Sequence, residues 1–418
     1  MSQSTFTTIA LLLFPSAHAL RVPPPATRRE LLKSVTAAGV LQELVSHPAL
    51  VRASEASDGK VPYGSDVAGG LEFIVPQSEL LAKLASAPVR NIVITGANSG
   101  VGFAGAKILT AAGHHVTLAC RTQAKADAAA KACLAYAASS ADNGPATGAP
   151  GFYGERRAGG TAVGAECDLT SLASIKAFAA AQKEPIDSLV LNAGLSLNVG
   201  DDKEQFTKDG FELTVGTNYL GQFALYKLLE PALAKGAAAR LVVTGSGVHD
   251  PASEGGKQGG PEKWAGLGAL DGLAGGPGFT MVDGGAYDPD KAYKDSKLCD
   301  MLFMLEAARR GKGKLTANSF SPGLIADPKG FFRNQNPLFA KAFNTITQKA
   351  GVGETNDFAG SALAYMAVDP ALAGKTGGWY DALPLGKHSL AKHAPSVEAQ
   401  DAAKQAKLWE LSERLVMG

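Results

Sequence analysis

One short segment, TGANSGVG at residues 95–102, constrains the fold of this chain more than any other. It follows an apolar run, NIVIT, that reads as a buried strand, and it precedes a helical pattern. Gly96, Gly100 and Gly102 let the backbone turn tightly and approach a ligand with no Cβ in the way. A helix that begins there offers free N–H groups and a partial positive charge to phosphates. The segment therefore predicts a strand–turn–helix unit that binds the pyrophosphate of a dinucleotide.

Strand-like and helix-like patterns alternate along the rest of the chain. Such alternation predicts parallel strands with right-handed crossovers and helices on both faces. We therefore expect one doubly wound parallel α/β sheet of the Rossmann type, with its ligand at the carboxyl ends of the strands. The expected strands are 91–95, 115–120, 162–167, 188–191, 240–244, 316–319 and 378–380, and the expected helices include 100–112, an Ala-rich helix to about 137, 211–233, 290–310 and 400–416.

The first sixty residues read as a targeting region. An apolar run, IALLLF, is too short to span a bilayer, and SAHA offers small residues for cleavage. The basic, hydroxylated stretch that follows resembles a transit peptide, so residues 1–60 predict import into a plastid, to the stroma or the thylakoid surface. Arg28-Arg29 leaves export to the thylakoid lumen open, although Glu43 and His47 interrupt the next apolar stretch. Plain secretion is the competing interpretation.

The folded domain is expected to cover residues 89–418 and to carry two long loops. Residues 139–160 are rich in Gly, Ala and Pro without periodicity and predict a surface insertion. Residues 247–290 are too many for a structureless connection, which favours a lid or substrate loop. No later segment has eighteen uninterrupted apolar residues, so we expect no membrane span.

Charge and cysteine content disfavour several classes of function. The chain has 40 Lys and Arg against 39 Asp and Glu, a formal charge of +1, so we expect no nucleic-acid partner and no attraction to an anionic membrane. The cysteines form no CxxC pair and have no histidine at ligand spacing, so we expect reduced thiols and no metal site. They are Cys120, Cys133, Cys167 and Cys299.

Residues after the second and third strands indicate which nucleotide is bound. A carboxylate at position 121 would hold the ribose hydroxyls of NAD, whereas Arg121 offers a fork to the extra phosphate of NADP. NADPH is therefore the expected cofactor; a solvated loop arginine is the alternative. Asp168 is expected to accept from the adenine amine, with a helix N-cap as its alternative role. The expected cofactor-binding residues are Gly96, Asn98, Ser99, Gly100, Gly102, Arg121, Asp168, Asn192, Tyr293, Lys297, Pro322 and Gly323.

A second group of residues predicts acid–base chemistry beside the nucleotide. Tyr293 and Lys297, in AYKDSK, lie one helical turn apart on one face. A phenol with its ordinary pKa of about 10 is a poor catalyst at neutral pH, and a nearby ammonium together with an oxidised nicotinamide is expected to lower that pKa. Ser246 is placed to donate a hydrogen bond to the reacting group, and Asn218 to hold a water that relays protons to Lys297. Because a bare Tyr-x-x-x-Lys pattern is common by chance, the prediction depends on all four residues accompanying the nucleotide turn.

The motifs TGANSGVG, NAG, GTN, GS and YKDSK, in this order, resemble the short-chain dehydrogenase/reductase family over roughly residues 90–380. That resemblance implies that Asn218, Ser246, Tyr293 and Lys297 form a catalytic set. The long gap between Ser246 and Tyr293, with DGFELTVGTNYLGQF, GFFR and KLWELSERLV, resembles the light-dependent protochlorophyllide oxidoreductases more narrowly. This implies NADPH, a chlorophyll precursor, and light-driven reduction of one ring double bond with a proton from Tyr293.

Several positions depart from that subfamily. Ser321 and Leu324 stand around Pro322-Gly323 where the subfamily has a tyrosine and a cysteine, the cysteine being implicated in substrate handling and proton delivery. NAGLSLN and NYLGQF depart as well. Two alternatives therefore stay open: a light-independent carbonyl reductase or alcohol dehydrogenase acting on another apolar plastid compound, and a non-catalytic pigment- or NADP-binding protein. The expected partner is a small apolar molecule, such as a tetrapyrrole; peripheral thylakoid association and homo-oligomers stay open.

Overall fold

A computed structural model of the chain describes residues 72–76, 84, 87–139, 158–197, 203–237, 239–327 and 337–418. The expected targeting region lies outside the described residues. So do the GFFR stretch and most of the expected insertion at 139–160.

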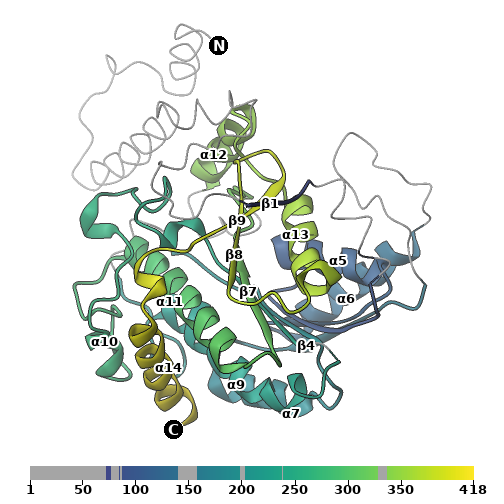
Figure 1. Ribbon diagram of the computed structural model, residues 1–418, viewed down its shortest axis with the longest axis horizontal. Coiled ribbons are helices and arrows are strands. Elements are labelled where there is room, and N and C mark those ends of the chain that lie inside the picture. Colours follow the sequence, from purple (N-terminus) through teal and green to yellow (C-terminus); the bar gives the residue numbers. More distant parts are fainter. Residues whose placement is uncertain are drawn as a thin grey trace, which may run out of the picture. The chain divides into compact units, whose positions relative to one another are not determined.

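The described strands form one nine-stranded sheet with the order β1-β9-β8-β7-β6-β5-β2-β3-β4 (Figure 1). Every pair from β4 to β8 is parallel, which confirms the doubly wound prediction. Strand order reverses between β2 and β5, and ligands of such sheets bind at that switch point. The parallel strands are β2 (Asn91–Thr95), β3 (His115–Cys120), β4 (Thr161–Glu166), β5 (Ser188–Leu191), β6 (Arg240–Thr244), β7 (Thr316–Phe320) and β8 (Gly378–Ala382).

One edge of the sheet is antiparallel, which the sequence patterns did not predict. β9 (Ser389–His393) pairs antiparallel with β8, and β1 (Glu72–Pro76) pairs antiparallel with β9. The connection from β8 to β9 is short, and a parallel pair would need a crossover of a dozen or more residues. β1 precedes residue 89, the expected start of the domain, and that boundary stays a prediction.

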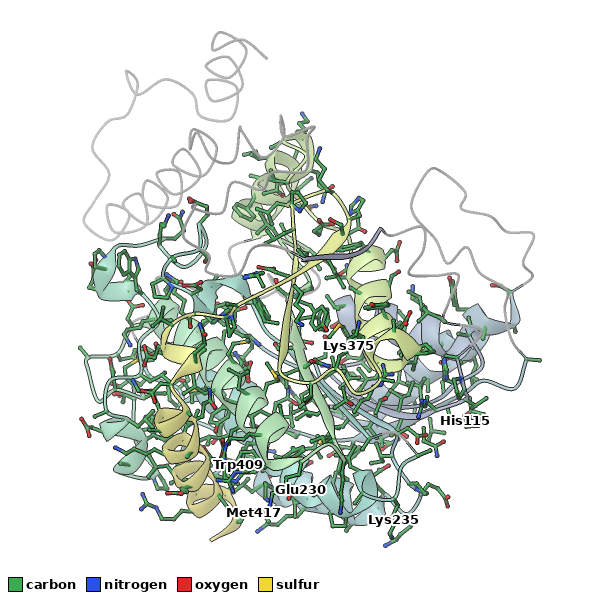
Figure 2. All side chains as sticks on the ribbon, in the orientation of Figure 1. His115, Glu230, Lys235, Lys375, Trp409 and Met417 are labelled. Atoms are coloured by element: carbon green, nitrogen blue, oxygen red, sulfur yellow. The ribbon has the colours of Figure 1, made fainter. Side chains whose placement is uncertain are left out.

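Helices cover both faces of the sheet because side chains alternate along each strand. Ile92 and Ile94 of β2 pack with α5, α6 and α13, whereas Val93 packs with the cluster that contains α7, α9, α11 and α14. Trp409 of α14, labelled in Figure 2, meets the ring of Phe223 from α9 edge-on at 5.1 Å. The longer helices are α5 (Gly100–Ala111), α6 (Gln123–Ala138), α7 (Leu172–Ala181), α9 (Gly221–Leu233), α11 (Pro289–Arg310), α12 (Pro337–Lys349), α13 (Asn356–Val368) and α14 (Ala402–Met417).

The helix expected over 211–233 consists of three elements instead of one. A short α8 (Leu213–Val215) leads into a π-helical turn, η2 (Gly216–Leu220), and then into α9. A Cβ at Gly221 would lie 2.4 Å from the carbonyl oxygen of Leu169, so glycine permits the helix to pass this close. Turns of this type occur often at functional sites.

The segment 247–290 contains short helical turns and is fixed to α11 by ion pairs. Nζ of Lys263 lies 2.9 Å from a carboxylate oxygen of Asp288, and Nζ of Lys291 lies 2.9 Å from a carboxylate oxygen of Asp283. Lys294, which is 2% exposed, donates to the carbonyl of Gln258 at 2.7 Å. A role as a substrate loop stays a prediction. Its helical turns are η3 (Gly247–His249), η4 (Pro261–Lys263) and α10 (Asp271–Ala274); further on lie η6 (Pro370–Leu372) and η7 (Glu398–Gln400).

The described residues contain neither a membrane-spanning helix nor a metal-binding cluster. No helix there is long and apolar enough to cross a bilayer. In the same residues no group of three or more His, Cys, Asp or Glu side chains is arranged to hold a metal ion. All four cysteines are buried and unpaired.

Candidate active site

The residues predicted from the sequence gather at one edge of the sheet, where the parallel strands end. Asn218 comes from the π-helical turn, and Tyr293 and Lys297 come from α11. The others are Gly96, Asn98, Ser99, Gly100 and Gly102 after β2, Arg121 after β3, Asp168 after β4, Asn192 after β5, Ser246 after β6, and Pro322 and Gly323 after β7.

The glycine turn packs directly against the chain that follows β5. Gly96 has a φ of +65°, and a Cβ there would lie 2.9 Å from the Cα of Ala193. A Cβ on Gly102 would lie 2.4 Å from Nδ2 of Asn192. Side chains at these two positions would therefore force apart the switch point where the sheet can receive a ligand.

Two residues that the sequence did not single out hold this junction together. The Thr95 hydroxyl accepts from the N–H groups of Asn192 and Ala193 at 2.9 and 3.0 Å. It donates to Oε1 of Gln222 at 3.0 Å, and Nε2 of Gln222 donates to the carbonyl of Ala193 at 2.8 Å. Asn192 in turn donates to the carbonyl of Thr95 at 2.9 Å. These bonds join the ends of β2 and β5 into one rigid unit.

Two basic side chains begin the segment after β3. Arg121 is exposed, and within the described part of the chain its guanidinium makes no hydrogen bond or ion pair. Lys125, in the first turn of α6, is exposed as well and was not predicted. An open hollow of about 250 Å³ lies between α6 and the glycine turn, lined by Asn98, Phe103, Lys125, Ala128, Ala129 and Ala132. An anionic group placed there would meet the Lys125 ammonium close to Asn98 of the glycine turn.

Asp168 is buried and already bonded within the protein. Its carboxylate accepts from the hydroxyl of Thr170 at 2.8 Å and from Nζ of Lys208 at 2.9 Å. Burial would raise the pKa of Asp168, but these hydrogen bonds outweigh burial and hold the pKa below its usual value. The alternative role as a helix N-cap is wrong, because Ser171 caps α7 and accepts from the N–H of Ser174.

Tyr293, Ser246 and Lys297 meet at the carboxyl end of β6. A side-chain hydrogen bond joins the Tyr293 and Ser246 hydroxyls. Burial raises the pKa of Tyr293, and the charge of Lys297 and the bond to Ser246 offset only part of that rise. Lys297 lowers the pKa as expected, but desolvation of the phenolate raises it by more. The lower pKa expected when an oxidised nicotinamide is also present stays a prediction. The phenol stays protonated at neutral pH and holds a proton that it can donate.

Lys297 is 5% exposed and has two protein acceptors. Its Nζ donates to the carbonyl of Thr244 at 2.9 Å and to Oδ2 of Asp300 at 3.0 Å. Burial alone would lower the pKa of Lys297, but the Asp300 carboxylate and Tyr293 raise it above its ordinary value. The lysine therefore carries its charge. Asp300 was not predicted from the sequence.

Asn218 holds the backbone after β5 against α11. Its Oδ1 accepts from the N–H of Leu195 at 2.8 Å, and its Nδ2 donates to the carbonyl of Leu195 at 2.9 Å and to Oγ of Ser296 at 3.0 Å. Ser296 donates to the carbonyl of Tyr293 at 2.7 Å. The side chain thus bonds protein groups directly, and the expected water relay to Lys297 stays a prediction.

Pro322 and Gly323 lie after β7, and Gly323 packs against Glu354 and Ala382. Gly323 has a φ of +81°, and a Cβ there would lie 2.5 Å from Cγ of Glu354. Leu324 is partly buried, and its carbonyl accepts from the N–H of Glu354 at 2.9 Å. Leu324 brings no side-chain proton donor to this position.

His249 fixes the loop that carries Ser246. It is 1% exposed, and the N–H of Ser396 donates to its Nε2 at 3.2 Å. Nδ1 must then carry the proton, and it donates to the carbonyl of Ser246 at 2.7 Å. The serine is therefore held by a buried histidine that reaches the segment before α14.

Comparisons with known proteins bear on what such a site does. A family model described as short chain dehydrogenase matches residues 153–270. The chain is 38% identical over 339 residues to a chloroplastic protochlorophyllide reductase of Cucumis sativus, covering 78% of this chain and 77% of that one. It is 37% identical over 341 residues to the chloroplastic protochlorophyllide reductase of Pisum sativum, with the same coverage. A crystal structure of a putative uncharacterized protein from Mycobacterium paratuberculosis is similar with a TM-score of 0.53 and 26% identity, covering 80% of this chain and 97% of that one.

Proposed function

The chain belongs to the short-chain dehydrogenase/reductase family, as a divergent member close to the protochlorophyllide reductases, and from this premise we propose that it reduces a ring double bond of a tetrapyrrole with NADPH in a light-driven step. As a member of that family it is a nicotinamide-dependent oxidoreductase. The observation that carries the proposal is the meeting of Ser246, Tyr293 and Lys297 next to the backbone after β5, against which the glycine turn packs.

The residues at the switch point fit a dinucleotide. Gly96 and Gly102 leave a surface with no Cβ where the chain after β2 meets the chain after β5. The N-terminus of α5 begins in the same turn, and Ser99, its N-cap residue, makes no side-chain capping bond. NADPH, when bound, supplies the hydride. Gly96, Asn98, Ser99, Gly100, Gly102 and Asn192 would hold it there.

Arg121 and Lys125 support NADPH rather than NADH. Both are cationic and exposed, and Lys125 lines the open hollow beside Asn98. A guanidinium pairs with a phosphate through two parallel hydrogen bonds, which a bare ribose cannot use. Asp168, already bound to Lys208 and Thr170, would accept from the adenine amine with its remaining lone pairs.

Ser246, Tyr293 and Lys297 have separate roles in the proposed proton transfer. Ser246 orients the Tyr293 hydroxyl, and that hydroxyl gives its proton to the carbon next to the one that receives the hydride. The double bond becomes a single bond, and the negative charge left on Tyr293 faces the Lys297 ammonium until solvent returns a proton. Because Leu324 cannot donate a proton, the proposal routes the proton through Tyr293 alone.

A second candidate function uses the same groups without light. The side chains of Ser321 and Leu324 favour it, since they replace the tyrosine and cysteine of the subfamily that the sequence resembles. In that case Tyr293 protonates the oxygen of a ketone or aldehyde during carbonyl reduction. The non-catalytic alternative loses support, because the family is one of oxidoreductases and Asn218, Ser246, Tyr293 and Lys297 are all present.

The test is to incubate the purified protein with NADPH and protochlorophyllide and to compare illuminated with dark samples. The proposal expects conversion to the chlorophyllide spectrum only in the light. Bound pigment without any light-dependent change contradicts it. Oxidation of NADPH in darkness by a panel of apolar ketones and aldehydes supports the second candidate.

The relatives carry chloroplastic in their names, and we propose a plastid location for this chain too. Fusion of residues 1–60 to a fluorescent protein tests it, with import into the plastid as the expected result. Thylakoid association and oligomeric state stay predictions.

A further inference from the structure

A buried ion pair lies within the candidate active site but outside the four residues predicted as catalytic. Asp300 stands one helical turn after Lys297 on α11, and its Oδ2 lies 3.0 Å from Nζ of Lys297. The two side chains are only 4% and 6% exposed. A carboxylate this deeply buried is costly unless it is paired, so its place beside the lysine calls for a reason.

The contacts of Lys297 show what the carboxylate does to its position. An ammonium has three N–H donors, and two of them bond Asp300 on the same helix and the carbonyl of Thr244 at the end of β6. A Cβ on Gly194 would lie 3.8 Å from Nζ, so the ammonium faces the backbone after β5. Two fixed acceptors therefore hold Nζ in place and leave one N–H for another group.

The charges around the pair come from two elements in the described part of the chain. Lys297, Tyr293 and Cys299 interact with Asp300 from α11 itself, and Tyr219 does so from the π-helical turn. Tyr219 is fully buried, and its hydroxyl is bonded to Ser412 of α14. The only opposite charge among these groups is Lys297. Asp300 therefore acts chiefly on Lys297 and, through its negative charge, on the Tyr293 phenol.

We propose that Asp300 is a positioning residue for the reaction proposed above: its carboxylate holds the Lys297 ammonium against Thr244 and keeps the Tyr293 proton from leaving before the substrate takes it. This inference rests on the proposed function. It adds a fifth residue to the site, one that touches neither substrate nor cofactor and acts through Lys297.

If Asp300 has this role, activity depends on its protonation state. A carboxylate with a purely structural role elsewhere would not have this effect on activity. Burial raises the pKa of Asp300 to about 6, although Lys297 opposes that rise. Below about pH 6 the carboxylate takes a proton, and Lys297 loses its charged partner. At higher pH, removing the Asp300 charge would also lower the pKa of Tyr293, because this charge is one of the causes that raise it.

The experiment compares wild type with Asp300→Asn, which keeps an oxygen acceptor for Lys297 but removes the charge. We expect a wild-type kcat/KM that falls below about pH 6, and an Asp300→Asn variant in which that acid limb is gone and kcat at neutral pH is reduced about tenfold or more. Glu306→Gln is the matched control. It removes a buried, ion-paired carboxylate near the C-terminal end of α11 and should keep the wild-type pH profile. Superimposable profiles for wild type and Asp300→Asn overturn the proposal.

A second readout needs no turnover and separates this inference from the proposed function. With ¹³C-labelled tyrosine, the Tyr293 signal is assigned by its loss in Tyr293→Phe and followed by NMR as the pH changes. In wild type it should shift with an inflection near pH 6, and in Asp300→Asn that inflection should be absent. A wild-type signal without the inflection refutes the role of Asp300 even if the variant does not fold. If this signal behaves as expected but no substrate is reduced, the proposed function fails and the charge coupling stands.

Discussion

Replacing Gly102 by alanine tests whether the glycine turn must pack against the end of β5. The new Cβ would lie 2.4 Å from Nδ2 of Asn192 and 2.8 Å from the carbonyl oxygen of Gly96, well inside normal contact distances. No φ strain is involved, so the cost is steric. Overpacking of this kind costs about 1–3 kcal/mol. If Asn192 moves away, its hydrogen bond to Thr95 is lost, which adds about 0.5–1.5 kcal/mol. The expected loss in free energy of unfolding is therefore about 1.5–4.5 kcal/mol.

The assay is urea unfolding without nucleotide, followed by titration with NADPH. We expect the lower stability together with at least about tenfold weaker NADPH binding, because the displaced Asn192 lies at the proposed nucleotide seat. Gly266→Ala is the control, since a Cβ there finds its nearest neighbour, Oε2 of Glu398, at 3.9 Å. Asn192→Ala combined with Gly102→Ala should recover part of the stability. A Gly102→Ala protein that matches wild type in both measurements would refute the packing argument.

Three further changes probe the selectivity, the pH response and the proton route. Arg121→Glu should weaken NADPH binding about tenfold or more while leaving NADH binding nearly unchanged, and equal losses for both nucleotides in fluorescence titrations would contradict the assignment. The pKa of His388 is raised by its hydrogen bond to Glu354, so the pair contributes stability below the ordinary histidine pKa of about 6.5 and loses it as pH rises through the raised value. The stability gap between wild type and His388→Asn, measured by urea unfolding, should therefore shrink from pH 6 to pH 8.5; a constant gap would rule out the ion pair. Leu324→Cys should raise the yield of light-driven reduction under single flashes if proton delivery limits it, and an unchanged yield would show that Tyr293 already suffices.

Local patterns were sufficient to predict the parallel part of the sheet. β2, β3, β5 and β6 have the expected bounds, because each is a short apolar run between turn residues, which is typical of strands buried on both faces of a parallel sheet. β9, with the sequence SLAKH, has no such run and exists because it pairs with β8. The long helix expected over 211–233 is interrupted at the π-helical turn, which no periodicity reveals.

In the candidate active site too, local patterns predicted some residues, and others became apparent only in the folded structure. Motif spacing predicted that Ser246, Tyr293 and Lys297 lie together, but it did not indicate a role for Asp300, since an aspartate within a helix is most often on its solvated face. Motif spacing indicated that Lys297 lowers the pKa of Tyr293, but not that burial raises this pKa by more, because desolvation depends on how the folded chain packs around the phenol. Thr95 and Gln222 likewise acquire their roles only when the ends of β2 and β5 meet.

The proton on Tyr293 is the centre of the proposed chemistry, and Tyr293→Phe removes it with little change in shape. The decisive measurement is the yield of reduced pigment after illumination of wild type and Tyr293→Phe, both saturated with NADPH and protochlorophyllide. We expect the variant to bind both ligands and to lose about a hundredfold or more of the yield. A variant that binds both and reduces the pigment as well as wild type would contradict the account.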